Sequence, residues 1–373
     1  MPQITAEPDH AVLSASGAHR WALCAGSRKA EEGLPDTTSP AAAEGTVAHE
    51  LAALTLNRGD HCLDHYADQE MADFVRKYTD YCRQISKDAD TLIEHRVDFS
   101  DHVPGGFGTA DFISINDGTA HIVDLKYGFN RVYAHKNLQG LCYALGVISD
   151  LSFIYTIDTI TFTIVQPRLD HIDEWSISLP ELLKSGEWIS QRAEEAMTDG
   201  ASLTPGEIQC RFCKAKATCP ALQQLTSDTL MVDFDDLSGA ANPDALTEAQ
   251  LAKALSNKAL IVGWLDAVER VARAKLEAGE DFPGWKLVAG RANRKWIDED
   301  KALSALVSIL GSPALATTTK VLSPAQAEKA LGKARKASIG SLITTPQGQP
   351  SLAPAGDPRP AVNVSPNDFE EVR

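Results

Sequence analysis

The chain has 373 residues, 43% of them hydrophobic and 6% aromatic, which is long enough for one large globular domain and an accessory region. No stretch approaches the roughly 20 consecutive apolar residues of a membrane span, and the first residues lack a signal-peptide pattern, so we expect a cytoplasmic protein with no membrane partner. A net charge of −16 excludes a positive field over the whole molecule, so any contact with nucleic acid must be local.

The first part of the chain mixes two hydrophobic periods. Apolar spacing, capping residues and turn signals predict these elements in order: helices over 11–33, 39–58 and 68–92, three strands within 93–127, a helix over 135–149, strands over 158–166 and 172–178, and a helix from Pro180 to about 198. This order predicts an α/β fold in which helices flank a central mixed sheet. The sequence contains no internal repeat.

The second part of the chain carries fewer signals. Residues 226–245 are rich in Asp, Gly, Asn and Pro and are predicted to be a linker. Residues 246–343 are predicted to form a mainly helical accessory region that begins with a long helix over 246–278. Residues 344–373 are rich in proline and poor in large apolar groups, so we expect a disordered tail.

A predicted hairpin carries the most specific chemistry. Asp117-Gly118 suits a two-residue turn, because both residues tolerate a positive φ. If the residues that flank this turn face each other, paired residue numbers sum to 235 and Asp111 falls opposite Asp124. We expect both carboxylates on one face of the sheet, with Cβ atoms roughly 4.5–5.5 Å apart. Two facing carboxylates repel each other, so this placement predicts a bound cation, Mg²⁺ or Mn²⁺.

Strand alternation adds two groups to this hairpin. Lys126 shares a face with Asp124, while the side chain of Leu125 points into the core and leaves its backbone carbonyl available to a metal. An exposed Asp–Lys ion pair is the alternative interpretation, since such pairs are common and stabilise little. The strand is apolar around these charges, however, and their desolvation cost favours a functional role.

The run 108–111, the run 124–126, and the pair Gln139 and Tyr143 resemble the PD-(D/E)XK nuclease superfamily, in particular its RecB-like branch. The resemblance implies that the first acidic residue and the Asp-x-Lys residues form a metal-dependent active site, while Gln139 and Tyr143 line it and contact DNA. Without the resemblance, these two residues would be an ordinary half-buried pair on one helix face.

Two further residues depend on the same resemblance. The run 44–50 resembles a motif of the family whose histidine, here His49, joins the metal shell. A lone histidine beside apolar residues is otherwise most often a core or surface group. Glu94 stands where members of the family often carry an acidic residue, which makes it a weaker candidate.

The seven cysteines are an odd number, and in a reducing cytosol a cysteine cluster is better suited to a metal than to disulfides. Cys210, Cys213 and Cys219 lie within ten residues, and Cys24 can supply a fourth ligand. This distribution resembles the iron-sulfur nucleases of the AddB and CRISPR-adaptation type, which implies a [4Fe-4S] clasp between the ends of the domain. Four thiolates could equally hold Zn²⁺. The other cysteines are expected to be small buried hydrophobes: Cys62, Cys82 and Cys142.

A short basic segment near residue 290 is a candidate DNA contact, because cations and flat aromatic groups meet phosphates and unpaired bases. Its candidate residues are Lys286, Arg291, Arg294, Lys295 and Trp296. The alternative is a basic hairpin that pairs with acidic parts of the chain. With the earlier motifs, the segment resembles a phage-encoded family of RecB-like nucleases, which implies a role in phage recombination or replication in a bacterial host cell, beside a strand-annealing protein.

These patterns predict a metal-dependent DNA nuclease over residues 1–225 with an iron-sulfur clasp. We expect an exonuclease that hydrolyses phosphodiester bonds at DNA ends, because no separate reader of base edges is evident in the sequence. Two alternatives stay open: a non-catalytic DNA- or recombinase-binding protein on the same fold, and a zinc-stabilised scaffold without a nucleic-acid role.

Overall fold

The computed structural model describes residues 11–35, 39–64, 66–230, 247–280 and 282–285. Contacts divide the chain into two compact units, Met1–Pro283 and Gly284–Arg373, and every element described below belongs to the first. Among the described helices, none combines the length and apolar character that crossing a lipid bilayer requires. The basic segment from Lys286 to Trp296, the accessory region beyond residue 285 and the predicted tail lie outside the described residues.

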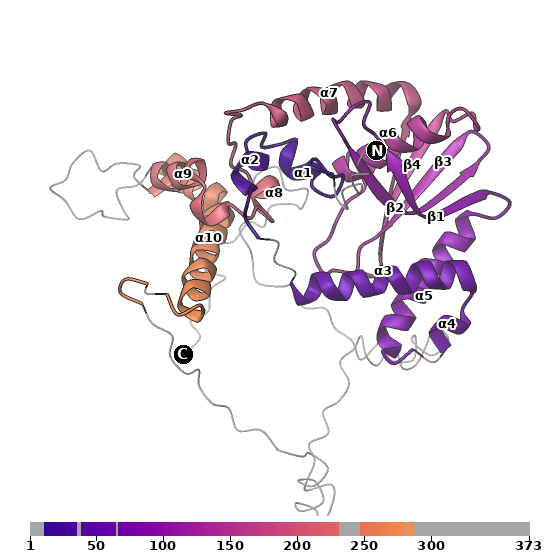
Figure 1. Ribbon diagram of the computed structural model, residues 1–373, viewed down its shortest axis with the longest axis horizontal. Helices are drawn as coiled ribbons and strands as arrows, with labels where there is room; N and C mark the ends of the chain where they lie inside the picture. Colours follow the sequence, from indigo (N-terminus) through magenta and orange to yellow (C-terminus); the bar gives the residue numbers. More distant parts are fainter. Residues whose placement is uncertain (1–10, 36–38, 65, 231–246, 281, 286–373) are drawn as a thin grey trace, which may run out of the picture. The chain divides into compact units, whose positions relative to one another are not determined.

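A five-stranded mixed sheet forms the centre of the fold, as the sequence predicted (Figure 1). Its strands follow chain order across the sheet: β1 (Asp90–Asp98), β2 (Phe107–Asn116), β3 (Thr119–Leu125), β4 (Thr159–Gln166) and β5 (His171–Ser178). Only β3 and β4 pair in parallel. A parallel pair needs a crossover connection, and α6 (Leu138–Leu151) lies within it.

The turn between β2 and β3 forms as predicted. Asp117 and Gly118 have φ angles of 45° and 76°, which is the left-handed region that a type I′ hairpin requires. Asn116 pairs with Thr119, and the register continues through Phe112 opposite Val123, so the predicted sum of 235 holds along the whole observed ladder.

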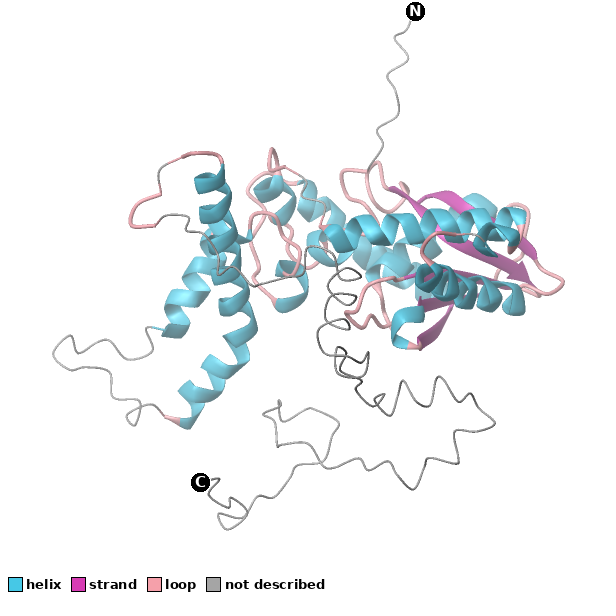
Figure 2. Cartoon of the chain, turned by 90° about the horizontal axis from the view of Figure 1, so that it is seen from below, coloured by secondary structure: helices cyan, strands magenta, loops and turns pink. Residues whose placement is uncertain are grey.

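Helices cover both faces of the sheet (Figures 1 and 2). On one face, α3 (Pro40–Arg58), α4 (His61–Asp64) and α5 (Gln69–Ile85) bury Phe112, Val123 and Leu125. On the other face, α6 and α7 (Leu179–Met197) bury a larger core that includes Ile113 and Ile122. The strands thus alternate between two apolar layers, which is why β3 reads as an almost continuous apolar run.

The helix predicted over 11–33 is wrong. The segment instead forms two short helices, α1 (Ala18–Trp21) and α2 (Ser27–Glu31). Between them, Gly26 donates its backbone N–H to the carbonyl of Ser202 at 2.9 Å, and a Cβ at this position would lie 2.5 Å from the carbonyl oxygen of Ala201. The close approach of a distant segment therefore overrides the local helical pattern.

The helix predicted over 68–92 is correct at its start and too long at its end. Asp68 caps the first turn of α5 by accepting a hydrogen bond from Met71 N–H at 3.0 Å. The helix ends at Ile85, and β1 begins at Asp90. Asp88 between them has a φ of 61°, a left-handed conformation that cannot continue a right-handed helix. The helix predicted over 135–149 begins three residues later, at Leu138, because Asn137 is its N-cap.

Three further helices follow the sheet: α8 (Glu207–Cys210), α9 (Pro220–Leu230) and α10 (Glu248–Glu277). The last confirms the long helix predicted from residue 246. Residues 226–230 of the predicted linker belong to α9, and the rest of that linker lies outside the described residues. Cys82 and Cys142 are buried as expected, whereas Cys62 is only half-buried.

Packing of α6 on the sheet gives the first prediction. A Cβ at Gly140 would lie 2.5 Å from the ring of the buried Phe162, so Gly140→Ala should lower the free energy of unfolding by about 1–3 kcal/mol. Gly45 is also inside a helix, but an added Cβ there meets nothing within 4 Å. Gly45→Ala should therefore stabilise the chain by about 0.5–1 kcal/mol. Urea denaturation of both variants checks this contrast, and equal stabilities would contradict the close packing.

Candidate metal and catalytic site

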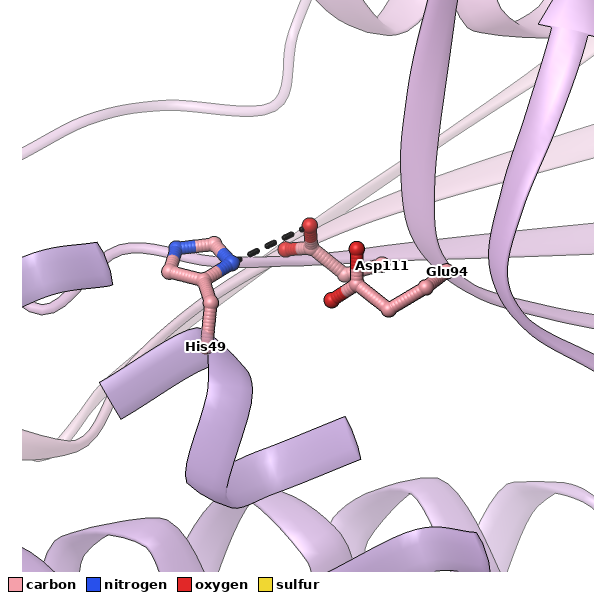
Figure 3. A group of neighbouring side chains, drawn as sticks. All are labelled: His49, Glu94 and Asp111. Atoms are coloured by element: carbon pink, nitrogen blue, oxygen red, sulfur yellow. Dashed lines mark ion pairs between the residues drawn. The ribbon is translucent and has the colours of Figure 1, made fainter. Parts of the chain in front are cut away.

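The candidate site lies where both helical layers meet the end of β3. Figure 3 shows three side chains directed toward one another, with His49 coming from α3. His49, Glu94 and Asp111 each offer one ligand atom, and these atoms all lie within 4.8 Å of one another. An imidazole nitrogen and two carboxylates at this spacing can coordinate one divalent cation.

His49 connects α3 with the sheet. Its Nδ1 atom lies 3.1 Å from Asp111 Oδ1. Burial disfavours the charged imidazole, but the hydrogen bond that His49 donates to Asp111 and the negative charge of Asp111 outweigh this effect and raise the pKa of His49. The ring opens onto a cavity of about 610 Å³ that Glu94, Glu50 and Arg58 also line. Solvent and a substrate can therefore reach the histidine.

Glu94 has an unusual backbone. Its φ is 49°, and it is missing from the β1–β2 pairing between Ile93 opposite Phe112 and His95 opposite Ala110. A left-handed conformation of a residue other than glycine costs about 1–3 kcal/mol, and such strain is concentrated at functional sites. Although the residue is exposed, desolvation of its carboxyl group and then the charge of Asp111 raise the pKa of Glu94 to about 7.

Asp111 marks the point where β2 and β3 separate. Their pairing ends at Phe112 opposite Val123, one position before Asp111 would face Asp124. There the Asp111 carboxylate accepts a hydrogen bond from the backbone N–H of Leu125 at 2.7 Å. The side chain of Asp111 thus occupies the place of a strand acceptor, with its other oxygen directed to His49.

The predicted pairing of Asp111 with Asp124 lies beyond the observed ladder, although the charge of Asp111 still raises the pKa of Asp124. Asp111 contacts His49 of α3, whereas Asp124 contacts Gln139 of α6, and these helices cover opposite faces of the sheet. The two acids approach the end of β3 from different layers. Leu125 between them is fully buried in the α3–α5 core, as the alternation predicted.

Asp124 is almost completely buried, at 1% exposure. Its Oδ1 accepts a hydrogen bond from Gln139 Nε2 at 3.2 Å, and its Oδ2 lies 2.7 Å from Lys126 Nζ. The Lys126 contact is an ion pair without hydrogen-bond geometry, so Oδ2 accepts no hydrogen bond within the described part of the chain. Burial raises the pKa of Asp124, against the opposing effect of the Lys126 charge.

Lys126, Gln139 and Tyr143 form a connected polar row. Lys126 Nζ donates to Gln139 Oε1 at 3.0 Å, and Gln139 Nε2 donates to the Tyr143 hydroxyl at 3.0 Å. Burial disfavours the ammonium, but the charges of Asp124 and Asp111 outweigh burial and raise the pKa of Lys126. The lysine is therefore a cation near neutral pH and a hydrogen-bond donor rather than a base.

One neighbour of the site escaped the sequence analysis. His19 of α1 lies 3.4 Å from Asn137 Oδ1 through its Nε2 atom. Burial lowers the pKa of His19, and the charge of Lys126 lowers it further, so the neutral form of the ring is favoured. The sequence does not predict a role for His19, because no local pattern separates it from an ordinary helix residue.

The four predicted metal-binding cysteines gather between the two ends of the domain. Burial raises the pKa of Cys24, and the nearby thiols of Cys210 and Cys219 raise it further. Thr204 donates its backbone N–H to Cys24 Sγ at 3.2 Å, and burial raises the pKa of Cys213 to about 12. Within the described residues, no three of the four sulfur atoms all lie within 4.8 Å of one another. Helix α10 covers this group with Leu260.

The raised pKa of Glu94 gives the second prediction. Between the ordinary value of 4.5 and about 7, the folded chain holds a proton that the unfolded chain releases. Without divalent metal, stability should therefore fall as pH rises through this window, because Glu94 becomes charged beside Asp111. Glu94→Gln should weaken this loss. Urea midpoints between pH 5 and 8 measure it, with Glu50→Gln as the control, and identical profiles of wild type and Glu94→Gln would contradict the assignment.

Comparisons with known proteins identify a family and include a similar solved structure. Residues 10–360 match the family described as "Protein of unknown function (DUF2800)". The structure titled "Crystal structure of SSO0001" is similar at 15% identity over 59% of this chain and 90% of that chain, with a TM-score of 0.28. This level of similarity assigns neither a fold nor a function. Because the family match extends over most of its length, the chain belongs to the DUF2800 family.

Proposed function

We propose that this chain is a metal-dependent deoxyribonuclease of the PD-(D/E)XK superfamily, in its RecB-like branch. One observation carries the proposal: the ligand group of His49, Glu94 and Asp111 lies beside Asp124 and its ion-paired Lys126. Metal ligands, a buried carboxylate and an ammonium at one strand end are the parts that phosphodiester hydrolysis needs.

The residues present fit a divalent cation. The ligand atoms of His49, Glu94 and Asp111 are close enough for repulsion between the carboxylates, which a cation would relieve. Asp124 Oδ2 is buried and lies 2.7 Å from Lys126 Nζ, so this carboxylate is already paired with a cation and the ligand group consists of the other three residues. Oxygen-rich sites suit Mg²⁺ or Mn²⁺, and the imidazole favours Mn²⁺ of the two. When bound, the cation polarises a phosphoryl oxygen and lowers the pKa of a water molecule.

The protein groups then divide the remaining tasks. Lys126 is a fixed positive charge, so it stabilises negative charge that develops on the phosphate and orients water by hydrogen bonding. Gln139 holds Lys126 and Asp124 at once, which keeps the ammonium in place. Tyr143 continues this row but is itself buried, at 6% exposure, so its hydroxyl holds Gln139 in place. In the described part of the chain no element stands out as a reader of base edges, so we propose digestion from DNA ends.

We further propose that the four cysteines hold a [4Fe-4S] cluster rather than zinc. One tetrahedral Zn²⁺ with Zn–S bonds of ~2.3 Å would keep its sulfur ligands about 3.8 Å apart. The observed sulfurs are neighbours but spread more widely than this, which suits a larger group. The backbone N–H groups of Thr204 and Gly206 point at Cys24 and Cys210, and such hydrogen bonds tune cluster potentials.

Substitutions in the Asp-x-Lys run give the third prediction. Asp124→Asn and Lys126→Ala should each lower the Mn²⁺-dependent hydrolysis rate of end-labelled linear DNA by about 100-fold or more, because each removes charge that acts on the reacting phosphate. The matched control is Asp117→Asn, a carboxylate of the same hairpin whose turn conformation asparagine also adopts. Hydrolysis by Asp124→Asn at the wild-type rate would exclude this centre, and a closed circular substrate distinguishes digestion from ends from internal cleavage.

The cysteine proposal gives the fourth prediction. Protein purified without oxygen should be brown and contain about four iron and four sulfide ions per chain. Cys213→Ser should lose most of this iron, whereas Cys62→Ser, at a half-buried cysteine away from the group, should retain it. A colourless wild-type protein with about one zinc ion per chain would reject the cluster in favour of the zinc alternative.

A further inference from the structure

Residues 127–137 join Lys126 to Gln139, so this segment leaves the candidate site at one end and returns to it at the other. After its first two residues, the segment contains three aromatic or histidine side chains. It also contains two cations and no acidic residue. We call it the linking segment. Its composition contrasts with a chain whose net charge is −16.

Buried side chains of the sheet fix the backbone of the linking segment. Gln166 of β4 is fully buried, accepts a hydrogen bond from Val132 N–H at 2.8 Å and donates to the carbonyl oxygens of Gly128 and Asn130 at 3.3 and 2.9 Å. Asp173 of β5 accepts a hydrogen bond from Ala134 N–H at 2.6 Å. The segment is therefore held in one conformation although it contains no helix or strand.

Tyr127 at the start of the segment is buried, but the other two aromatic side chains face solvent. Phe129 is 67% exposed and Tyr133 is 59% exposed. Arg168 lies over the ring of Phe129, with its guanidinium carbon 4.2 Å from the ring centroid. Single exposed apolar residues are common and indicate no function. Exposed rings that are held in place, with a cation stacked on one of them, indicate a binding surface.

The row of rings continues along the edge strand β5. Tyr133 meets His171 edge-on with centroids 5.7 Å apart, and His135 meets Trp175 in the same way at 5.4 Å. Trp175 then opens onto a cavity of about 630 Å³, a volume within the range of small-ligand sites. The far wall of this cavity comes from α7 and includes Trp188.

The charges around this cavity favour an anion. Lys136 and Lys184 line it, and within the described residues neither lysine forms an ion pair. Arg131 of the linking segment is likewise without an ion pair in that part of the chain. Glu181 is the acid in the lining, and its carboxylate already accepts hydrogen bonds from the backbone N–H and hydroxyl of Ser178.

We propose that the linking segment and the Trp175–Trp188 cavity bind a single nucleic-acid strand through its unpaired bases, and that this strand continues to Lys126. The second half of the statement rests on the proposed nuclease function. Every base has a flat face that stacks on an aromatic ring, and the unpaired cations meet the phosphates between bases. Paired bases in a duplex cannot offer their faces in this way, so the site selects single strands or the frayed end of a duplex.

Binding to a labelled 30-nucleotide thymidine strand without divalent metal tests the site, with fluorescence anisotropy as the readout. Phe129→Ala and Trp188→Ala should each weaken binding about tenfold, since each removes one stacking surface. The matched control is Phe153→Ala, which removes an 80% exposed ring beyond the opposite end of α6. Lys136→Ala should weaken binding and reduce its salt dependence, whereas Lys87→Ala, exposed after α5 on the other face, should do neither.

Wild-type affinity in Phe129→Ala and Trp188→Ala, or an equal loss in the Phe153→Ala control, would overturn the proposal. Equal affinity for a blunt duplex of the same length would also overturn it. Thermal unfolding of each variant separates lost binding from lost folding. The two proposals can fail separately, because Asp124→Asn should still bind the strand. Strand binding without hydrolysis by the wild type would reject the nuclease and keep this binding site. Hydrolysis by the wild type without the binding losses of Phe129→Ala and Trp188→Ala would reject the binding site and keep the nuclease.

Discussion

The hydrogen bond from Leu125 N–H to the Asp111 carboxylate determines the architecture of the candidate site. Because a side chain takes the place of a backbone acceptor, β2 leaves β3 one residue before the expected end of their ladder. The departing strand carries Asp111 toward α3, and the end of β3 keeps Asp124 beneath α6. This hydrogen bond thus accompanies the contact of Asp111 with His49 and leaves Asp124 paired with Lys126.

Charge is balanced in two adjoining groups around this bond. On the α3 side, the raised pKa values of His49 and Glu94 partly neutralise the charge of Asp111, and a divalent cation would replace these protons. On the α6 side, the ammonium of Lys126 balances the charge of Asp124. The charges of Asp124 and Asp111 together raise the pKa of Lys126, so the ammonium stays charged despite its burial. The site therefore has two parts: the His49–Glu94–Asp111 group, which could hold a cation, and Lys126, which is itself a cation. A phosphate between the two parts would meet positive charge on both sides once a cation is bound.

The hairpin could be predicted from sequence because its turn chemistry is local: Asp117-Gly118 determines the register of every pair in the observed ladder. The orientation of Asp111 could not be predicted, since it depends on a side chain replacing a backbone acceptor. His49 was identified only through family resemblance, and Glu94 gained its place through a strained backbone conformation that no periodicity reveals. The broken helix before residue 33 has a similar cause, the distant carbonyl that approaches Gly26.

The side chains of the candidate site come from both helical layers. His49, shown in Figure 3, lies on one side of the sheet, and Gln139 lies on the other. Neither layer alone contains a complete centre. Under the nuclease proposal, a newly synthesised chain in which only one layer has docked would be unable to hydrolyse DNA. Hydrolytic competence would then come late in folding, after both layers have packed on the sheet.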